Sequence, residues 1–188
     1  MNLKEQLNLS DENYNLLFDI RRSVRYHDRR KSFFYAIQNV VSFLSVIMAG
    51  VVIMDAVKQG ITPYWMISVG VIAAILSALD LVIGFSKKAD MHSKLREKFA
   101  DLEIDIITGP PSGEIWLEYQ KKRLVIEKDE PAIYFAIDGL CRNELLIADG
   151  FSRLNDACHF AKVNWLQRLS AHWFHWQNAT FFSIMFAS

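Results

Sequence analysis

Two stretches of the chain lack the polar positions that each turn of a surface helix normally carries. Residues 32–54 hold no charged side chain, and residues 59–79 hold none either. The range 40–53 is apolar on essentially all faces of a helix, which is typical of a helix that is buried or spans a membrane. A helix needs about 20 mostly apolar residues to cross the hydrocarbon layer. The pattern predicts transmembrane helices at 33–55 and 64–86; the alternative is two buried helices in a soluble bundle.

The segment between the two stretches is short and ends in turn-forming residues. It runs from 55 to 63 and contains Gly60 and Pro63, which favour a turn followed by a helix start. So short a connection predicts an antiparallel hairpin. Aromatic residues flank the stretches, as expected at membrane interfaces: Tyr64 and Trp65 at one side, and Phe33, Phe34 and Tyr35 at the other.

Basic residues give the hairpin an orientation. They gather before the first span (Arg21, Arg22, Arg25, Arg29, Arg30, Lys31) and after the second (Lys87, Lys88, Lys94, Arg96, Lys98), whereas the loop holds only Lys58. The positive-inside rule therefore predicts that both termini are cytoplasmic. Because residues of both charge signs precede the first span, it is not expected to be a cleaved signal peptide.

Outside the spans the pattern is that of amphipathic helices. Ser10 is a good N-cap before two acids, and the apolar stripe Leu16, Leu17, Ile20, Val24 predicts a helix that runs into the first span. The stripe Met91, Leu95, Phe99, Leu102, Ile106 predicts that the second span continues as a helix to Thr108. Side by side, the two would form a stalk that acts either as a lever or as a simple extension.

The remaining residues predict a third, C-terminal region. Residues 109–113 (GPPSG) break the chain, and helices are expected at 114–128, from 129–131 to 149, and from 152 onward. The last stretch is rich in Trp and Phe. It is expected to pack in the core or between subunits, to lie in the membrane interface, or to span the membrane.

The predicted fold is therefore an all-α membrane protein. It comprises an antiparallel two-helix transmembrane hairpin with long cytoplasmic helical extensions and a C-terminal helical region. The expected segments are a cytoplasmic helix at 1–32, the hairpin at 33–86, the extension at 87–108 and the C-terminal region at 109–188.

Asp80 is the candidate functional residue of the spans. It precedes Lys87 by seven positions, which places it about 10 Å inside the cytoplasmic flank. A charge at a helix centre costs about 2.5–3.5 kcal/mol on insertion scales, so such residues face a pore or a polar partner. Gln38 and Asn39 lie at comparable depth in an antiparallel hairpin. The three residues either line a conduit or stabilise helix packing.

Other residues are candidates for contact with lipid headgroups. They are the basic residues at the cytoplasmic ends of the spans and two tryptophans of the last stretch: Arg29, Arg30, Lys31, Lys87, Lys88, Trp173 and Trp176.

Composition and motifs argue against several other functions. Twenty-one basic and 21 acidic residues balance, so no direct nucleic-acid binding is expected. Two cysteines are too few for a disulfide framework. No phosphate-binding, nucleophile-elbow or zinc-protease motif occurs, so neither enzymatic activity nor a cofactor is expected. His172 and His175, which could share a metal, are surrounded by aromatic residues, and no metal site is expected there.

The layout resembles a known family. An amphipathic helix with RRSVRYHDRRKSFFY leads into a two-span hairpin, and a helix with KLREKFADLEIDI follows. The segment DEPAIYFAIDGLCRNELLIADG adds to the likeness. Over residues 10–150 this is similar to the SLATT superfamily of two-transmembrane effector domains in bacterial conflict systems.

That resemblance implies a function. It implies a homo-oligomer in the bacterial inner membrane that permeabilises or depolarises the membrane during antiphage defence. The trigger would come from a separate sensor or inhibitor protein, or from a nucleotide-signalling or reverse-transcriptase system, because this chain shows no sensor motif. The alternative is a non-conducting membrane adaptor that recruits a cytoplasmic partner.

Overall fold

The computed structural model describes residues 9–56, 64–109 and 113–176. Those residues form helices joined by irregular segments and contain no β-strand, which confirms the all-α prediction. The expected interhelical turn at 57–63, the cap at Ser112 and the end of the aromatic tail at 177–188 lie outside the described residues.

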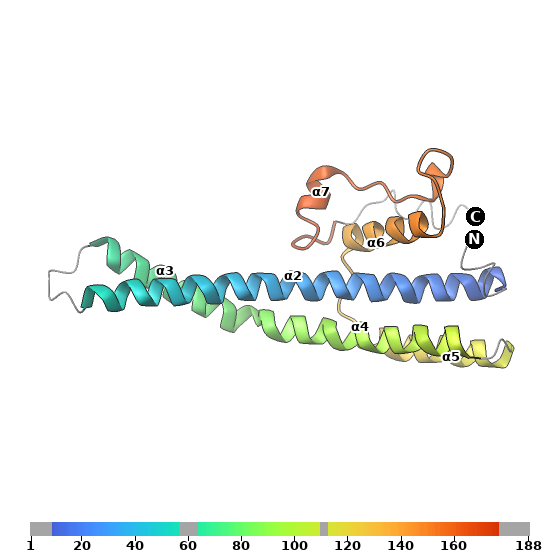
Figure 1. Ribbon diagram of the computed structural model, residues 1–188, viewed down its shortest axis with the longest axis horizontal. Helices are drawn as coiled ribbons and strands as arrows, with labels where there is room; N and C mark the ends of the chain where they lie inside the picture. Colours follow the sequence, from blue (N-terminus) through green and yellow to red (C-terminus); the bar gives the residue numbers. More distant parts are fainter. Residues whose placement is uncertain (1–8, 57–63, 110–112, 177–188) are drawn as a thin grey trace. The chain divides into compact units, whose positions relative to one another are not determined.

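The first apolar stretch lies in α2 (Asp11–Ala56), as the sequence predicted. The helix begins where Ser10 caps it, because the backbone N–H of Asn13 donates to Ser10 Oγ at 3.3 Å. The second apolar stretch forms α3 (Tyr64–Ile83) (Figure 1).

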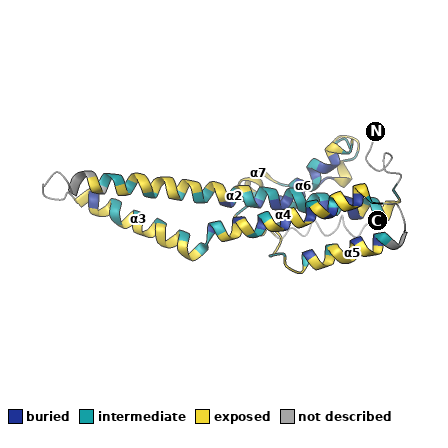
Figure 2. Cartoon of the chain, turned by 60° about the horizontal axis from the view of Figure 1, so that its bottom comes forward, coloured by how far each residue is buried: buried dark blue, intermediate teal, exposed yellow. Residues whose placement is uncertain are grey.

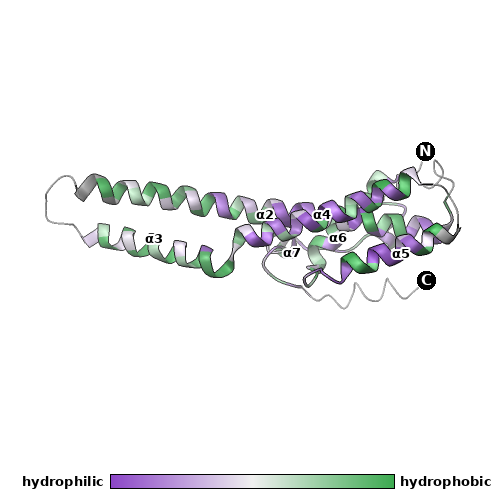
Figure 3. Ribbon diagram, turned by 90° about the horizontal axis from the view of Figure 1, so that it is seen from below, coloured by the Kyte–Doolittle hydropathy of each residue, from purple (hydrophilic) through white to green (hydrophobic). Residues whose placement is uncertain are grey.

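Both apolar segments are long enough to cross a membrane by length and composition, and both are exposed. Only 6% of the apolar window in each helix is buried inside the molecule. Figure 2 shows mainly exposed and intermediate positions along α3, and Figure 3 shows that these positions are apolar. A core helix of a soluble bundle would instead be mostly buried, so these surfaces suit a surrounding that is itself apolar.

The second span does not continue as one uninterrupted helix, which corrects the sequence prediction. α3 ends at Ile83, and α4 (Phe85–Thr108) begins after Gly84. Gly84 adopts a φ of 63°, in the left-handed region. Glycine reaches this region without the clash that a Cβ causes, so the chain can change course here. Backbone hydrogen bonds persist on both sides, from Gly84 N–H to the Asp80 carbonyl (2.8 Å) and from Lys88 N–H to the Gly84 carbonyl (3.0 Å).

The chain divides into two units. Residues 30–92 form one, here called the apolar unit, and residues 1–29 with 93–188 form the other, here called the charged unit.

In the charged unit, α2 and α4 pack side by side in antiparallel directions. Arg21 Nε lies 3.2 Å from Glu103 Oε1, and Arg96 Nε lies 3.1 Å from Asp28 Oδ1. In the predicted apolar stripes the most deeply buried members are Leu17, Ile20 and Phe99.

The charged unit also contains α5 (Gly113–Glu127) and α6 (Phe135–Ala148). α5 matches the predicted helix, but α6 begins later than expected. The sequence predicted a start at 129–131, whereas residues 130–134 are not helical and Ile133 is exposed. The reason is a tertiary contact: Tyr134 N–H donates to Tyr26 Oη at 3.0 Å, and Tyr134 has extended backbone angles.

The last helical stretch expected from residue 152 is largely absent from the described residues, which corrects that prediction. A short 3₁₀ helix η1 (Ala157–His159) and the five-residue α7 (Trp165–Leu169) interrupt an irregular path. Gly150, with a φ of 92°, turns the chain after α6. Ala161 then bonds to the Asn143 side chain instead of to a helical turn.

Candidate functional site

The polar residues of the apolar unit are the first candidate site. Asp80 and Gln38 are half-buried, and Asn39 is exposed. Within the described residues, none of the three side chains forms a hydrogen bond or an ion pair. The structure therefore does not bring Asp80 into hydrogen-bonding contact with Gln38 or Asn39, and their shared role stays a prediction.

An aromatic and basic cluster joins α2 to the start of α4 in the same unit. Phe34, Phe85 and Ala89 are buried together. The Arg30 guanidinium lies 4.7 Å from the centroid of the Phe34 ring, and His92 stacks on that ring at 5.7 Å. A cation is attracted to the face of an aromatic ring, so the contact with Phe34 stabilises the buried Arg30 guanidinium.

The predicted headgroup contacts occupy different surroundings. Arg30 is buried in that cluster, whereas Lys87 and Lys88 are exposed and Lys31 is half-buried. The half-buried Arg29 donates from Nη2 to Glu144 Oε1. Although Lys88 is exposed, its Nζ lies 5.8 Å from the centroid of the Phe34 ring.

The two predicted interfacial tryptophans are exposed. Trp173 presents much of its indole to the surface. Trp176 donates from Nε1 to Ser170 Oγ at 3.0 Å. An indole with an apolar body and a satisfied polar edge suits a membrane interface.

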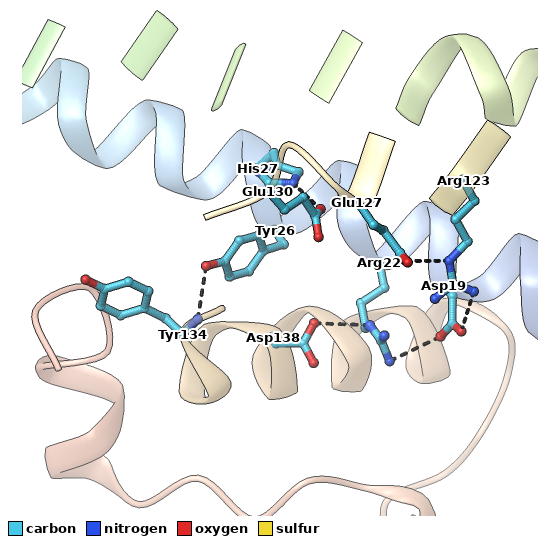
Figure 4. A network of polar contacts seen from close by, with 9 residues as sticks. All are labelled: Asp19, Arg22, Tyr26, His27, Arg123, Glu127, Glu130, Tyr134 and Asp138. Carbon is cyan, nitrogen blue, oxygen red and sulfur yellow. Dashed lines mark hydrogen bonds and ion pairs between the residues drawn. The ribbon is translucent and has the colours of Figure 1, made fainter. Parts of the chain in front are cut away.

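An ion-pair network in the charged unit joins three helices (Figure 4). Asp19 on α2 accepts from Arg123 Nη1 on α5 at 3.0 Å and lies 3.2 Å from Arg22 Nη1. Arg22 Nε in turn lies 3.1 Å from Asp138 Oδ1 on α6, and Arg123 Nε donates to Glu127 at 2.6 Å. Single exposed ion pairs contribute about 0–1 kcal/mol, but these half-buried groups share partners, so removal of one charge affects several contacts.

A second group of contacts holds the segment between α5 and α6 on α2. His27 is buried, and its Nε2 lies 2.7 Å from Glu130 Oε1. The imidazole stacks on Phe99 of α4 with ring centroids 5.6 Å apart, and Tyr26 contacts it edge-on. The Tyr26 hydroxyl also accepts the hydrogen bond from the backbone N–H of Tyr134. One turn of α2 therefore contacts α4 through Phe99, and it contacts the connecting segment through Glu130 and Tyr134, as Figure 4 shows.

Burial and neighbouring charges shift several pKa values here. Burial raises the pKa of Asp138 above its ordinary value, although Arg22 acts in the opposite direction. Burial opposes charge on Arg123 as well, but Asp19 and Glu127 raise its pKa overall. Burial raises the pKa of the Cys141 thiol to about 12, so the thiol stays protonated and unreactive at neutral pH.

Sequence reasoning missed this network because its members are far apart in the chain. Asp19 and Arg123 are separated by 104 positions, and periodicity carries no information about such pairing. A signal was nevertheless present: acids and arginines alternate on one amphipathic helix, Asp19, Arg21, Arg22, Arg25, Asp28 and Arg29. That pattern favours ion pairing with neighbouring helices rather than a plain solvated face.

The described residues contain no group of three His, Cys, Asp or Glu side chains that could hold a metal. Comparisons with protein-family models, curated proteins and solved structures found no match to this chain.

Proposed function

We propose that the chain is an inner-membrane effector of a bacterial antiphage system, as its likeness to the SLATT superfamily implies. Its two apolar helices form an antiparallel transmembrane hairpin with both termini in the cytoplasm. Several copies assemble in the bilayer and permeabilise or depolarise it when a separate sensor or inhibitor protein triggers them.

The observation that carries the proposal is an ionisable residue without a partner on an exposed apolar helix. The Asp80 side chain has no hydrogen bond or ion pair among the described residues, and the helix around it is exposed. In a bilayer such a carboxylate needs water or a polar group from elsewhere. A neighbouring copy and a hydrated conduit would supply both.

Small residues support the assembly step. α3 carries Ser68, Gly70, Ala74, Ser77 and Ala78, and residues of this size let helices approach closely in lipid. A Cβ added at Gly70 would meet nothing within 4 Å inside the chain, so that position leaves room for an approaching helix.

The alternative function is a non-conducting adaptor, and the charged unit favours it. Its ion pairs hold α2, α5 and α6 together, and we infer that these helices recruit a soluble partner. In that case Asp80 only stabilises helix packing between copies.

The test is membrane potential and dye entry in bacteria after induced expression. Asp80→Asn removes the charge with little change in size, and Asp101→Asn on an exposed turn of α4 is the matched control. The proposal expects depolarisation by the unchanged protein and the control, and a weaker or altered leak with Asp80→Asn at equal membrane abundance. Equal depolarisation by all three proteins would show that Asp80 does not line the conduit. Absence of depolarisation, with the presumed trigger system co-expressed, would favour the adaptor.

A further inference from the structure

The segment that follows α6 has an irregular path but is firmly attached. Asn143 of α6, itself buried, donates from Nδ2 to the Ala161 carbonyl and accepts the Ala161 N–H at Oδ1, both at 2.8 Å. Phe160 and Ala171 are buried on either side of α7. Within α7, Asn164 and Gln167 form a reciprocal capping box. The backbone of this segment is therefore held in one place.

Its large apolar side chains nevertheless face outward. Trp165 is 72% exposed, Leu169 is 77% exposed and Trp173 is 58% exposed. Leu166 and Phe174 are also exposed, and these five residues are here called the aromatic patch. On a helix with 100° per residue, the three patch members of α7 fall within an arc of about 100°.

A patch of this kind needs an explanation. Tryptophan carries roughly 150–250 Å² of surface, so two exposed indoles and three further apolar side chains make a patch in the range that marks interaction sites. Because the backbone is attached at Asn143 and Ala171, the exposure does not result from a missing core contact within the described segment. The side chains are held where a partner can cover them.

The charge around the patch identifies the partner. No Asp or Glu occurs after Asp156, whereas Lys162 and Arg168 are present. Trp and Phe in a segment whose Lys and Arg are not balanced by any Asp or Glu after Asp156 match the chemistry of an anionic lipid surface, since indoles prefer the headgroup region and cations attract its phosphates. We infer that the aromatic patch inserts into the headgroup region of an anionic bilayer.

This inference rests on the proposed membrane location, which supplies its physical advantage. A unit tethered by two spans stays near the bilayer surface, so a contact too weak for a free protein becomes effective. The patch would then hold the charged unit on the membrane in the absence of its partner.

The experiment uses the full chain in liposomes that contain anionic lipids with brominated acyl chains, which quench indoles on contact. Single-tryptophan proteins are made by changing the other four tryptophans to Phe. One retains Trp173 and tests the patch. One retains Trp65, at the start of α3, and reports span insertion. One retains Trp116, which is buried in α5, and is the negative control.

The inference expects Trp173 and Trp65 to lose most of their fluorescence and Trp116 to keep it. A quenched Trp65 with an unquenched Trp173 overturns the inference and leaves the membrane location intact. If Trp173 is then also blue-shifted, a second copy or another protein segment covers the patch. An unquenched Trp65 contradicts the membrane location and, with it, the inference.

Two variants that each introduce one glutamate test the patch directly. Leu169→Glu places an acid inside the apolar arc, whereas Gln167→Glu places the same charge on another face and preserves the capping box. The inference expects Trp173 quenching to fall in Leu169→Glu and to persist in Gln167→Glu. Equal quenching in both variants, or equal quenching in purely zwitterionic liposomes, overturns the assignment to an anionic surface.

Discussion

Asn143 is the residue whose removal gives the most specific test of the charged unit. Its side chain is 6% exposed and forms two hydrogen bonds of 2.8 Å with the backbone of Ala161. In Asn143→Ala both bonds are lost, and the Ala161 N–H and carbonyl must find water. A net hydrogen bond is worth about 1 kcal/mol, and a buried group left unsatisfied costs about 1–3 kcal/mol.

The half-buried position of Ala161 allows partial rescue by water, so we expect a local cost of about 2–3 kcal/mol in the attachment of the segment. A tenfold change in an equilibrium constant corresponds to about 1.4 kcal/mol. The equilibrium constant for local opening of this segment should therefore rise by about 30- to 150-fold. Asn143→Asp keeps an acceptor for the Ala161 N–H but turns a carboxylate oxygen toward the Ala161 carbonyl. Its effect should be at least as large.

Hydrogen exchange in detergent or nanodiscs measures this directly, because local opening controls amide exchange. The Ala161 amide and those of α7 should exchange faster in Asn143→Ala, while amides of α2 and α4 should change little. Asn155→Ala, at an exposed position whose side chain forms no hydrogen bond with the described residues, is the matched control and should leave exchange unchanged. Unchanged exchange at Ala161 in Asn143→Ala, or an equal rise over all helices, would refute the reasoning.

Three further changes test other positions. Gly84→Ala should destabilise the protein by about 1–2 kcal/mol because of its left-handed φ, measured as thermal stability in detergent, whereas Gly70→Ala inside α3 should be neutral or stabilising. Gly109→Ala should lower stability by about 1–3 kcal/mol, because its Cβ would overlap the Tyr119 hydroxyl and lie 2.7 Å from a carbonyl oxygen; stability equal to the parent would contradict this. A maleimide should modify the exposed Cys158 but not the buried Cys141 in the folded protein, and both after unfolding. Since burial raises the Cys141 pKa from 9.0 to about 12, the stability linked to this thiol should be complete below pH 9 and be lost as pH rises toward 12.

The helices that depend on periodicity could be predicted from the sequence. The stripes containing Leu17, Ile20 and Phe99 repeat at helical spacing, and these side chains are buried as expected. The cap at Ser10 was likewise readable, because it needs only local residues. Such features are determined within one or two turns of the chain.

The features that depend on distant contacts could not be predicted. The delayed start of α6 follows from the bond between Tyr134 and Tyr26, which lie 108 positions apart. The irregular course after α6 follows from the Asn143 bonds to Ala161, because local propensity cannot reveal that a side chain will satisfy this backbone. Gly84 lies inside the predicted second span, and only its left-handed angle shows that α3 ends there.

The candidate site was predictable in composition and not in contacts. Asp80 stands out in any hydropathy analysis, because it is the one charge within a long uncharged stretch. Whether another side chain reaches Asp80 depends on how each helix is rotated about its axis. A helix that is apolar on all faces gives no sequence signal for that rotation. The ion pairs around Asp19 were missed for the opposite reason, since many charges offered many possible pairings.

The long sequence separations in the charged unit have a consequence for how the protein is made. α2 is synthesised before the residues that bind it. Asp19 pairs with Arg123, which follows it by 104 residues, and Tyr14 donates to Asp149, which follows it by 135 residues. At about 5–20 residues per second, the first of these gaps lasts roughly 5 to 20 seconds. Both apolar stretches are synthesised within that interval, and Leu17 and Ile20 are made well before α4 (Phe85–Thr108). The nascent chain therefore meets the membrane-insertion machinery before its charged unit can close, and chaperones that cover exposed apolar stripes should bind α2 in that interval.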